Sequence, residues 1–133
     1  MDKRIPKDEM KAVFLQKLRG HGVQDEALAD ECAEIMMQNS LNGVYSHGVN
    51  RFPRLIRYID AGYIRPDARP TRILALGAFE QWDGNLGLGV NNARFCMDRA
   101  IAMAKEQGIG CVALRNTNHW MRGGQYALQA ADA

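Results

Sequence analysis

The hydrophobic pattern of this chain changes its period near residue 70, and this change limits the folds that the chain can adopt. Before that point, apolar residues recur every three or four positions, which is typical of amphipathic helices. After it, segments typical of strands at 73–76, 78–82 and 109–114 enclose a helical segment that ends at Gly108. A strand, helix, strand order indicates an α/β unit. We therefore expect a mixed α/β chain whose N-terminal part is helical.

Three helices are predicted in the first part, over about residues 6–20, 25–40 and 50–62. A segment with two prolines and no clear period, residues 63–70, follows them and is typical of a linker. We expect an N-terminal helical subdomain over residues 1–66 and a second domain that begins at residue 67 and is cut short at residue 133.

Three finer expectations concern the second part. Asn91 or Asn92 is expected to cap the helix that ends at Gly108. The run 109–114 is almost wholly apolar, which favours a strand buried on both faces. The last segment, 124–133, begins a helix without a C-cap, so we expect the chain to be the N-terminal part of a longer protein.

The charge and the cysteines exclude several classes of protein. There are 17 basic and 15 acidic residues, with a net charge of +2 and no basic run, which argues against a nucleic-acid binder. No apolar stretch is long enough to span a bilayer, and the N-terminus lacks the apolar core of a signal peptide, so a soluble cytoplasmic protein is expected. Cys32, Cys96 and Cys111 form neither a CxxC motif nor a Cys/His cluster. We expect no metal site and no disulfide, and all three cysteines buried.

The first candidate site is the polar segment at residues 45–51, Tyr-Ser-His-Gly-Val-Asn-Arg. An imidazole such as that of His47 can exchange a proton near neutral pH. Arg51 begins the next helix and can pair with a carboxylate through two hydrogen bonds. A proton donor with a carboxylate partner suits the reduction of a 2-oxo acid. The alternative is structural: Ser46 caps the helix, His47 satisfies a backbone carbonyl and Arg51 is solvated.

The second candidate site is residues 115–124, which directly follow the last predicted strand. Ligands of open α/β sheets bind beyond the carboxyl ends of strands. Asn118 and His119 offer an amide and an imidazole, Trp120 an apolar wall, and the Gly-Gly pair at 123–124 backbone amides for an anion. The alternative is an ordinary loop whose tryptophan is buried in the core. A third glycine-rich segment, 83–89, has the wrong spacing for the dinucleotide motif GxGxxG and is interpreted as a turn.

The segments GVYSHGVNRFPR, PDARPTRI, EQWDG and IGCVALRNTNHWMRGGQYALQAA closely resemble the malate/L-lactate/ureidoglycolate dehydrogenase family. The match runs along essentially the whole chain. Ser-His-Gly followed by Arg, and the later Asn-His, are marks of the family. Gly-Val-Tyr before the first motif and Trp-Met-Arg-Gly-Gly after the second favour a branch that acts on a 2-oxo sugar acid.

The resemblance implies a role for each matching residue. His47 matches the histidine that protonates the substrate carbonyl, and His119 matches a second active-site histidine that has this role in some relatives. Ser46 and Arg51 match positions that line the substrate pocket, with Arg51 as the carboxylate partner. Asn118 and Arg122 are implied neighbours of the substrate. Which histidine donates the proton stays open.

The resemblance also implies NAD or NADP as cofactor, on a fold that is not a Rossmann domain, and a homodimer. Residues 67–133 would then be the beginning of the central NAD(P)-binding domain. Members of the family are more than twice as long as this chain, so the cofactor would be bound mainly by residues beyond it. Two alternatives remain: a relative that acts on ureidoglycolate, malate, lactate or a cyclic imino acid, and an inactive fragment or interaction module.

Overall fold

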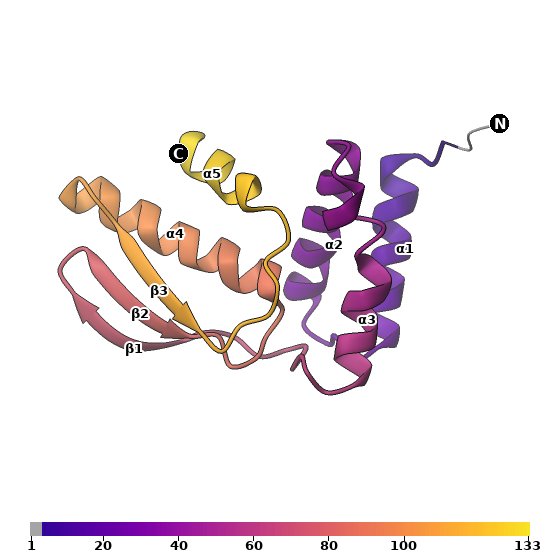
Figure 1. Ribbon diagram of the computed structural model, residues 1–133, viewed down its shortest axis with the longest axis horizontal. Coiled ribbons are helices and arrows are strands. Elements are labelled where there is room, and N and C mark those ends of the chain that lie inside the picture. Colours follow the sequence, from indigo (N-terminus) through magenta and orange to yellow (C-terminus); the bar gives the residue numbers. More distant parts are fainter. Residues whose placement is uncertain (1–3) are drawn as a thin grey trace. The chain divides into compact units, whose positions relative to one another are not determined.

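The structure is a computed structural model that describes residues 4–133 (Figure 1). It divides into two compact units, with the boundary between Asp67 and Ala68, one residue beyond the boundary that the sequence predicts. The first unit is helical and the second is a three-stranded sheet with two helices. The mixed α/β class expected from the sequence is confirmed. The identity of the second unit as the start of an NAD(P)-binding domain stays a prediction.

The first unit contains the three predicted helices and one additional short helix. These are α1 (Lys7–Gly20), α2 (Glu26–Leu41), the 3-10 helix η1 (Tyr45–His47) and α3 (Phe52–Asp60). Asp25 caps α2, because its carboxylate accepts hydrogen bonds from two backbone amides of the first turn. Pro53 lies in the first turn of α3, where the absence of an amide hydrogen costs nothing.

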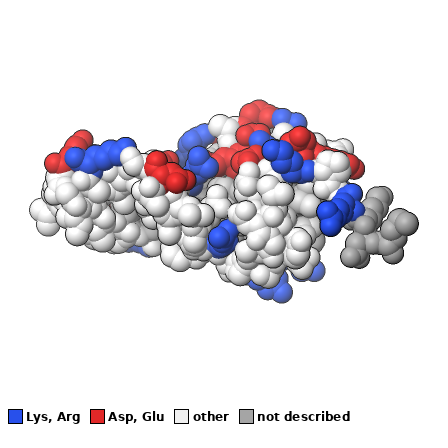
Figure 2. Space-filling model, turned by 90° about the horizontal axis from the view of Figure 1, so that it is seen from above, with Lys and Arg blue, Asp and Glu red and all other residues white. Residues whose placement is uncertain are grey.

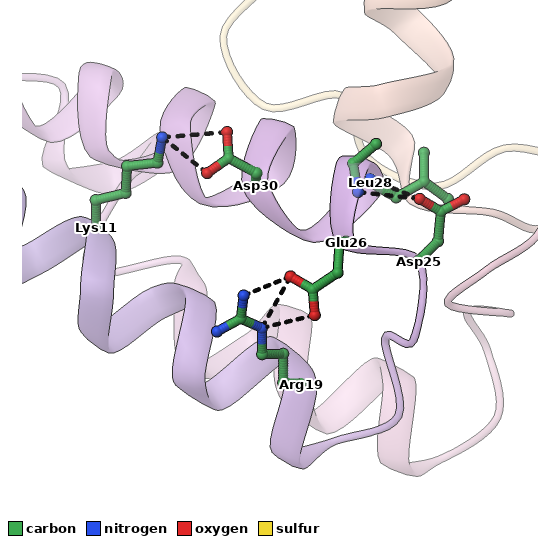
Figure 3. A network of polar contacts seen from close by, with 7 residues as sticks. Lys11, Arg19, Asp25, Glu26, Leu28 and Asp30 are labelled. Atoms are coloured by element: carbon green, nitrogen blue, oxygen red, sulfur yellow. Dashed lines mark hydrogen bonds and ion pairs between the residues drawn. The ribbon is translucent and has the colours of Figure 1, made fainter.

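Helices α1 and α2 pack against each other through apolar side chains, and ion pairs link their edges (Figure 3). Lys11 Nζ lies 2.9 Å from an Asp30 oxygen, and the Arg19 guanidinium pairs with the Glu26 carboxylate. These side chains are partly exposed, so solvent screens each pair and its contribution to stability is small. Burial of side chains such as Leu18, which is fully buried, therefore holds the two helices together.

Hydrogen bonds hold the segment that carries the first candidate site against the C-terminal end of α2. The Ser40 hydroxyl accepts a hydrogen bond from Val49 N at 2.9 Å, and Asn39 Nδ2 donates to the carbonyl of His47 at 3.1 Å. Gly48 lies so close to α2 that a Cβ atom there would overlap Ser40 Oγ and lie 2.8 Å from Ser40 N. Only glycine permits this approach, so η1 is held against rigid backbone.

The second unit is a βαβ arrangement preceded by one antiparallel strand. Its elements are β1 (Thr71–Leu76), β2 (Phe79–Asp83), α4 (Gly89–Gln107), β3 (Cys111–Arg115) and α5 (Gly123–Ala131). The sheet order is β1-β2-β3; β1 pairs antiparallel with β2, and β2 pairs parallel with β3. The predicted strand, helix, strand unit is therefore confirmed as β2-α4-β3.

Helix α4 lies along one face of the sheet, and α5 lies beside α4 (Figure 1). The rings of Trp82 on β2 and Phe95 on α4 meet edge to face, with centroids 4.7 Å apart. The prediction that 109–114 is buried on both faces is wrong, because Ile109 is 67% exposed and β3 is half-buried or exposed throughout. Helix α4 packs against one face of β3, and the exposure of the strand shows that its other face is open within residues 4–133.

The expectation for the cysteines is correct for two of the three. Cys32 and Cys96 are buried, and burial raises the pKa of these thiols to about 12 and about 11. Cys111 is exposed, because it opens the half-covered strand β3. The sequence could not show this, since an apolar run does not reveal how many faces are covered.

The predicted cap of α4 is also wrong. The helix begins at Gly89, and Leu88 occupies the N-cap position without a side-chain hydrogen bond. Asn91 and Asn92 lie inside the first turn and are buried. Asn92 makes tertiary hydrogen bonds with its amide group instead of capping the helix. The predicted end is correct, since Gly108 terminates α4 with a left-handed φ of 80°.

No helix among residues 4–133 combines the length and the apolar character that crossing a membrane requires. On the face drawn in Figure 2, basic and acidic side chains are interspersed.

A buried carboxylate joins the sheet to α4. Glu80 on β2 is 4% exposed and accepts two hydrogen bonds from Arg99 on α4, at 2.9 and 2.6 Å. Trp82 Nε1 donates a third at 2.8 Å, and Arg72 on β1 lies 3.6 Å away. The hydrogen bonds from Arg99, followed by that from Trp82, lower the pKa of Glu80 to about 2.

We expect Glu80→Gln to lower the free energy of unfolding by about 2–4 kcal/mol at pH 7, because Arg99 then loses its buried counter-charge. Urea denaturation measures the change. Glu106→Gln, at an exposed position of the same helix, is the matched control and should stay within about 0.5 kcal/mol of the wild type. Equal effects of the two substitutions would contradict the role assigned to Glu80.

The same ion pair predicts a dependence on pH. The pKa of Glu80 in the folded chain is lowered to about 2 from its ordinary value of 4.5. Its stabilisation is therefore fully present above pH 4.5 and is lost as the pH falls from 4.5 to 2. Unfolding curves of the wild type and Glu80→Gln, measured at several pH values, should converge in that window. A constant difference down to pH 2 would show that charge is not the cause.

We expect Gly48→Ala to destabilise the chain by about 1–3 kcal/mol, because the new methyl group overlaps α2. Thermal or urea unfolding measures the effect. Gly20→Ala, at the end of α1, is the matched control, since a methyl group there would have no atom within 4 Å outside its own stretch of helix. A Gly48→Ala chain as stable as Gly20→Ala would show that the loop can move away from α2 without cost.

Candidate functional site

The first candidate site is built around the short helix η1 in the helical unit. Ser46 Oγ lies 3.0 Å from His47 Nδ1, so the hydroxyl and the imidazole form a hydrogen-bonded pair. His47 is half-buried and Ser46 is exposed. Gly48 and Asn39 hold this turn on α2, so the imidazole is carried by a rigid part of the unit.

The structural alternative for Ser46 is wrong. The N-cap residue of α3 is Arg51, with no side-chain cap, and Ser46 makes its hydrogen bond to the His47 ring instead. The hydroxyl is thus placed to orient the imidazole. It can do so in either protonation state of the ring, because a hydroxyl both donates and accepts hydrogen bonds.

Arg51 lies four residues after His47, at the N-cap position of α3. Its backbone amide donates to Gly48 O at 3.0 Å, and Asn50 N donates to Tyr45 O at 3.0 Å, so the turn between His47 and Arg51 is internally bonded. Arg51 is half-buried at the start of α3. The positive end of the helix adds to its attraction for an anion. That its guanidinium faces the same ligand as His47 stays a prediction.

The second candidate site surrounds a cavity of about 340 Å³ in the α/β unit. It follows the carboxyl end of β3, where a ligand of a parallel sheet is expected. Asn118 and His119 line it together with Trp120, and the remaining wall residues are Gly89, Ala93, Leu114 and Thr117. Trp120 is 57% exposed, so the alternative that it is buried in the core is wrong.

The hydrogen bonds of this loop separate two roles. Asn118 Nδ2 donates to the carbonyls of Leu86 and Gly87, at 3.2 and 3.3 Å, which ties the loop after β3 to the loop after β2. His119 Nδ1 accepts a hydrogen bond from Met121 N at 2.8 Å. Asn118 therefore shapes the cavity through its amide, while His119 is one of the wall residues and its ring is oriented by Met121 N.

Arg122 occupies the N-cap position of α5, outside the wall of this cavity. A methyl group placed on Gly124 would lie 3.5 Å from Arg122 Nε, so the guanidinium lies against the first turn of the helix. Its Nη1 atom is buried and has no hydrogen-bond partner among the described residues. A buried donor without a partner is unfavourable, and an anion would satisfy it.

Sequence reasoning missed three residues on which the cavity depends. Asn92 Nδ2 donates to Gly84 O at 3.0 Å and to Thr117 Oγ1 at 3.1 Å, which links the loops that follow β2 and β3. A methyl group on Gly89 would overlap the carbonyl oxygens of residues 118 and 119. Asp83 accepts hydrogen bonds from Arg115 at the end of β3 and from Asn116 just after it, and a bond from Asn85 N together with these lowers the pKa of Asp83. Asp83 and Gly89 lie in the segment 83–89 that was interpreted from the sequence as a turn, and Asn92 was expected only as a possible helix cap.

The glycine-rich segment 83–89 does not fit a phosphate cradle. A methyl group on Gly84 would lie 2.6 Å from Asn92 Nδ2, and one on Gly87 would lie 2.5 Å from Ala68 O. The space beside these glycines is filled by the chain itself. They permit close packing of the loop and leave no room for the phosphates of a dinucleotide.

Comparison with known proteins gives concordant results. The family model described as malate/L-lactate dehydrogenase matches residues 5–133. The 2,3-diketo-L-gulonate reductases of Salmonella typhimurium (strain LT2) and Salmonella paratyphi B are 51% identical over 129 residues, 97% of this chain. The chain spans 39% of the length of these relatives.

Solved structures agree with the sequence relatives. Malate dehydrogenase from Pyrococcus horikoshii OT3 matches 98% of the chain with a TM-score of 0.93 and 35% identity. Sulfolactate dehydrogenase from Methanocaldococcus jannaschii matches 96% with a TM-score of 0.91 and 33% identity. The chain covers 37% of each of these structures. The chain therefore belongs to the malate/L-lactate dehydrogenase family.

Proposed function

We propose that the protein to which this chain contributes is a nicotinamide-dependent oxidoreductase that reduces a 2-oxo sugar acid, 2,3-diketo-L-gulonate or a close analogue. The observation that carries the proposal is the 51% identity, along 97% of the chain, to reductases of that name. The presence of a histidine motif and an arginine one turn later supports it, because proton donation and carboxylate binding are the two tasks that such a substrate sets.

His47 is the proposed proton donor. The Ser46 hydroxyl, 3.0 Å from His47 Nδ1, can accept from a protonated Nδ1 and so hold the cationic ring in one orientation. Nε2 then delivers its proton to the oxygen that becomes a hydroxyl group. NADH or NADPH supplies the hydride when it is bound. Ser46 is thus both a wall residue of the substrate pocket and the partner of the acid.

One arginine would hold the acid end of the substrate. Arg51 is the proposed carboxylate partner, because its planar fork binds a carboxylate through two parallel hydrogen bonds. Arg122 is proposed to contact the substrate as well, and its buried, unsatisfied Nη1 supports a role in binding an anion. Asn118 and His119, which line the cavity of the α/β unit, are proposed to contact the substrate as well.

The remaining features of the complete enzyme are also proposals. The dinucleotide would be bound mainly by residues outside this chain, since the glycine segment 83–89 has no space for phosphates. The enzyme would be a cytoplasmic homodimer. Dehydrogenases named for malate and sulfolactate share the fold, so the proposed substrate rests on sequence identity and not on the fold.

The test is a reductase assay of the complete enzyme with NADH and a panel of 2-oxo acids that includes 2,3-diketo-L-gulonate, pyruvate and oxaloacetate. We expect the highest kcat/KM for the sugar acid. His47→Gln should lower kcat by about 10²–10⁴-fold and leave the Kd for NADH within a few-fold, because only proton transfer is removed.

His21→Gln is the matched control, because His21 pairs with Asp60 at the end of α1, away from the histidine motif in the sequence. It should turn over like the wild type. Normal turnover of His47→Gln would remove His47 from the mechanism, and a preference for pyruvate or oxaloacetate would reassign the substrate. Failure of the 133-residue chain to bind NADH in a fluorescence titration would fit a binding site that lies mainly elsewhere.

A further inference from the structure

The loop that carries His119 fixes the orientation and the protonation of its ring. Met121 N donates to His119 Nδ1 at 2.8 Å. Met121 has a left-handed φ of 66°, which is uncommon for a residue other than glycine, and its side chain is 5% exposed. The Tyr126 hydroxyl donates to Trp120 O at 2.6 Å, so the backbone between His119 and Met121 is also held from α5. The Met121 amide is therefore locked in place beside the ring.

This hydrogen bond selects one form of the imidazole. A backbone N–H can donate to Nδ1 only when Nδ1 carries a lone pair, and in the neutral ring the proton then resides on Nε2. The imidazolium carries a hydrogen on both nitrogens, so it would set two N–H groups against each other at 2.8 Å. The loop thus favours neutral His119 with Nε2 as a donor.

His47 lies in a different environment. Its Nδ1 partner is the Ser46 hydroxyl, which can rotate to donate to a neutral ring or accept from a charged one. This hydroxyl can therefore bond to Nδ1 with or without a hydrogen on that atom. The hydroxyl partner of His47 therefore suits a ring that gains and loses a proton in each turnover.

We propose that His119 acts as a neutral hydrogen-bond donor, through Nε2–H, to a carbonyl oxygen of the ligand that enters the cavity, and that it does not deliver the proton. The proposal rests on the proposed function and assigns different tasks to its two histidines. Met121 is the positioning residue, acting through its backbone amide. Ala93, Leu114 and Trp120 give the cavity apolar walls, which strengthen a single hydrogen bond to a carbonyl.

The tautomer can be measured directly. Long-range nitrogen–proton NMR of the chain labelled with ¹⁵N-histidine, recorded at pH 7.5, distinguishes a protonated Nε2 from a protonated Nδ1. The chain has three histidines, so the His119 signals are identified by their loss in His119→Gln. We expect Nε2–H with an unprotonated Nδ1. A protonated Nδ1, an even mixture of tautomers or a doubly protonated ring would overturn the proposal.

A pair of substitutions in the complete enzyme tests the role. The Gln amide can place an N–H donor near the position of Nε2 but cannot release a proton, whereas Ala offers no donor. We expect His119→Gln to keep kcat/KM within about tenfold of the wild type and His119→Ala to lose about 10²–10³-fold. Equal, large losses in both would overturn the donor role. The tautomer measurement needs no turnover, so it tests the inference even where the enzyme proves not to reduce a 2-oxo acid.

Discussion

The α/β unit depends on one buried amide, that of Asn92. Its Nδ2 joins the carbonyl of Gly84, after β2, to the hydroxyl of Thr117, after β3. Because β2 and β3 are parallel, these two loops leave the sheet at the same edge, and the Asn92 amide links them there together with the hydrogen bonds of Asp83 and Asn118. The cavity lined by His119 lies at this edge, so its shape follows from that connection.

The two candidate sites achieve rigidity by different means. The turn with His47 is pressed against α2 by Gly48, where no side chain can fit, and is bonded to Asn39 and Ser40. The loop with His119 lies between β3 and α5, and its shape depends on left-handed φ angles at Asn116 and Met121. Strained backbone of this kind is commonly retained where a side chain must be aimed. In this loop, the hydrogen bond from Met121 N to His119 Nδ1 orients the imidazole ring.

Much of the fold could be predicted because the relevant signals are local. Asp25 before an apolar periodic run predicted the start of α2, and Gly108 after another predicted the end of α4. The cap assigned to Asn91 or Asn92 was wrong. An asparagine near the start of a helix can cap that helix or donate a hydrogen bond to a distant part of the chain, and the sequence looks the same in both cases. The predicted burial of β3 was too high. An apolar run indicates that a strand can be buried, but it does not show whether one or both faces of the strand are covered.

The sequence by itself determined which longer segments form helices and strands, which segments concentrate polar chemistry, and that Ser46, His47 and Arg51 fall within one short segment. These follow from backbone preference and spacing along a short stretch of chain. Only the tertiary structure decided that Ser46 bonds to the ring of His47, that Asn118 and His119 line one cavity, and that the buried Glu80 pairs with Arg99. The direction of a side chain and the partner of a buried polar group depend on residues far away in sequence, which no local pattern encodes.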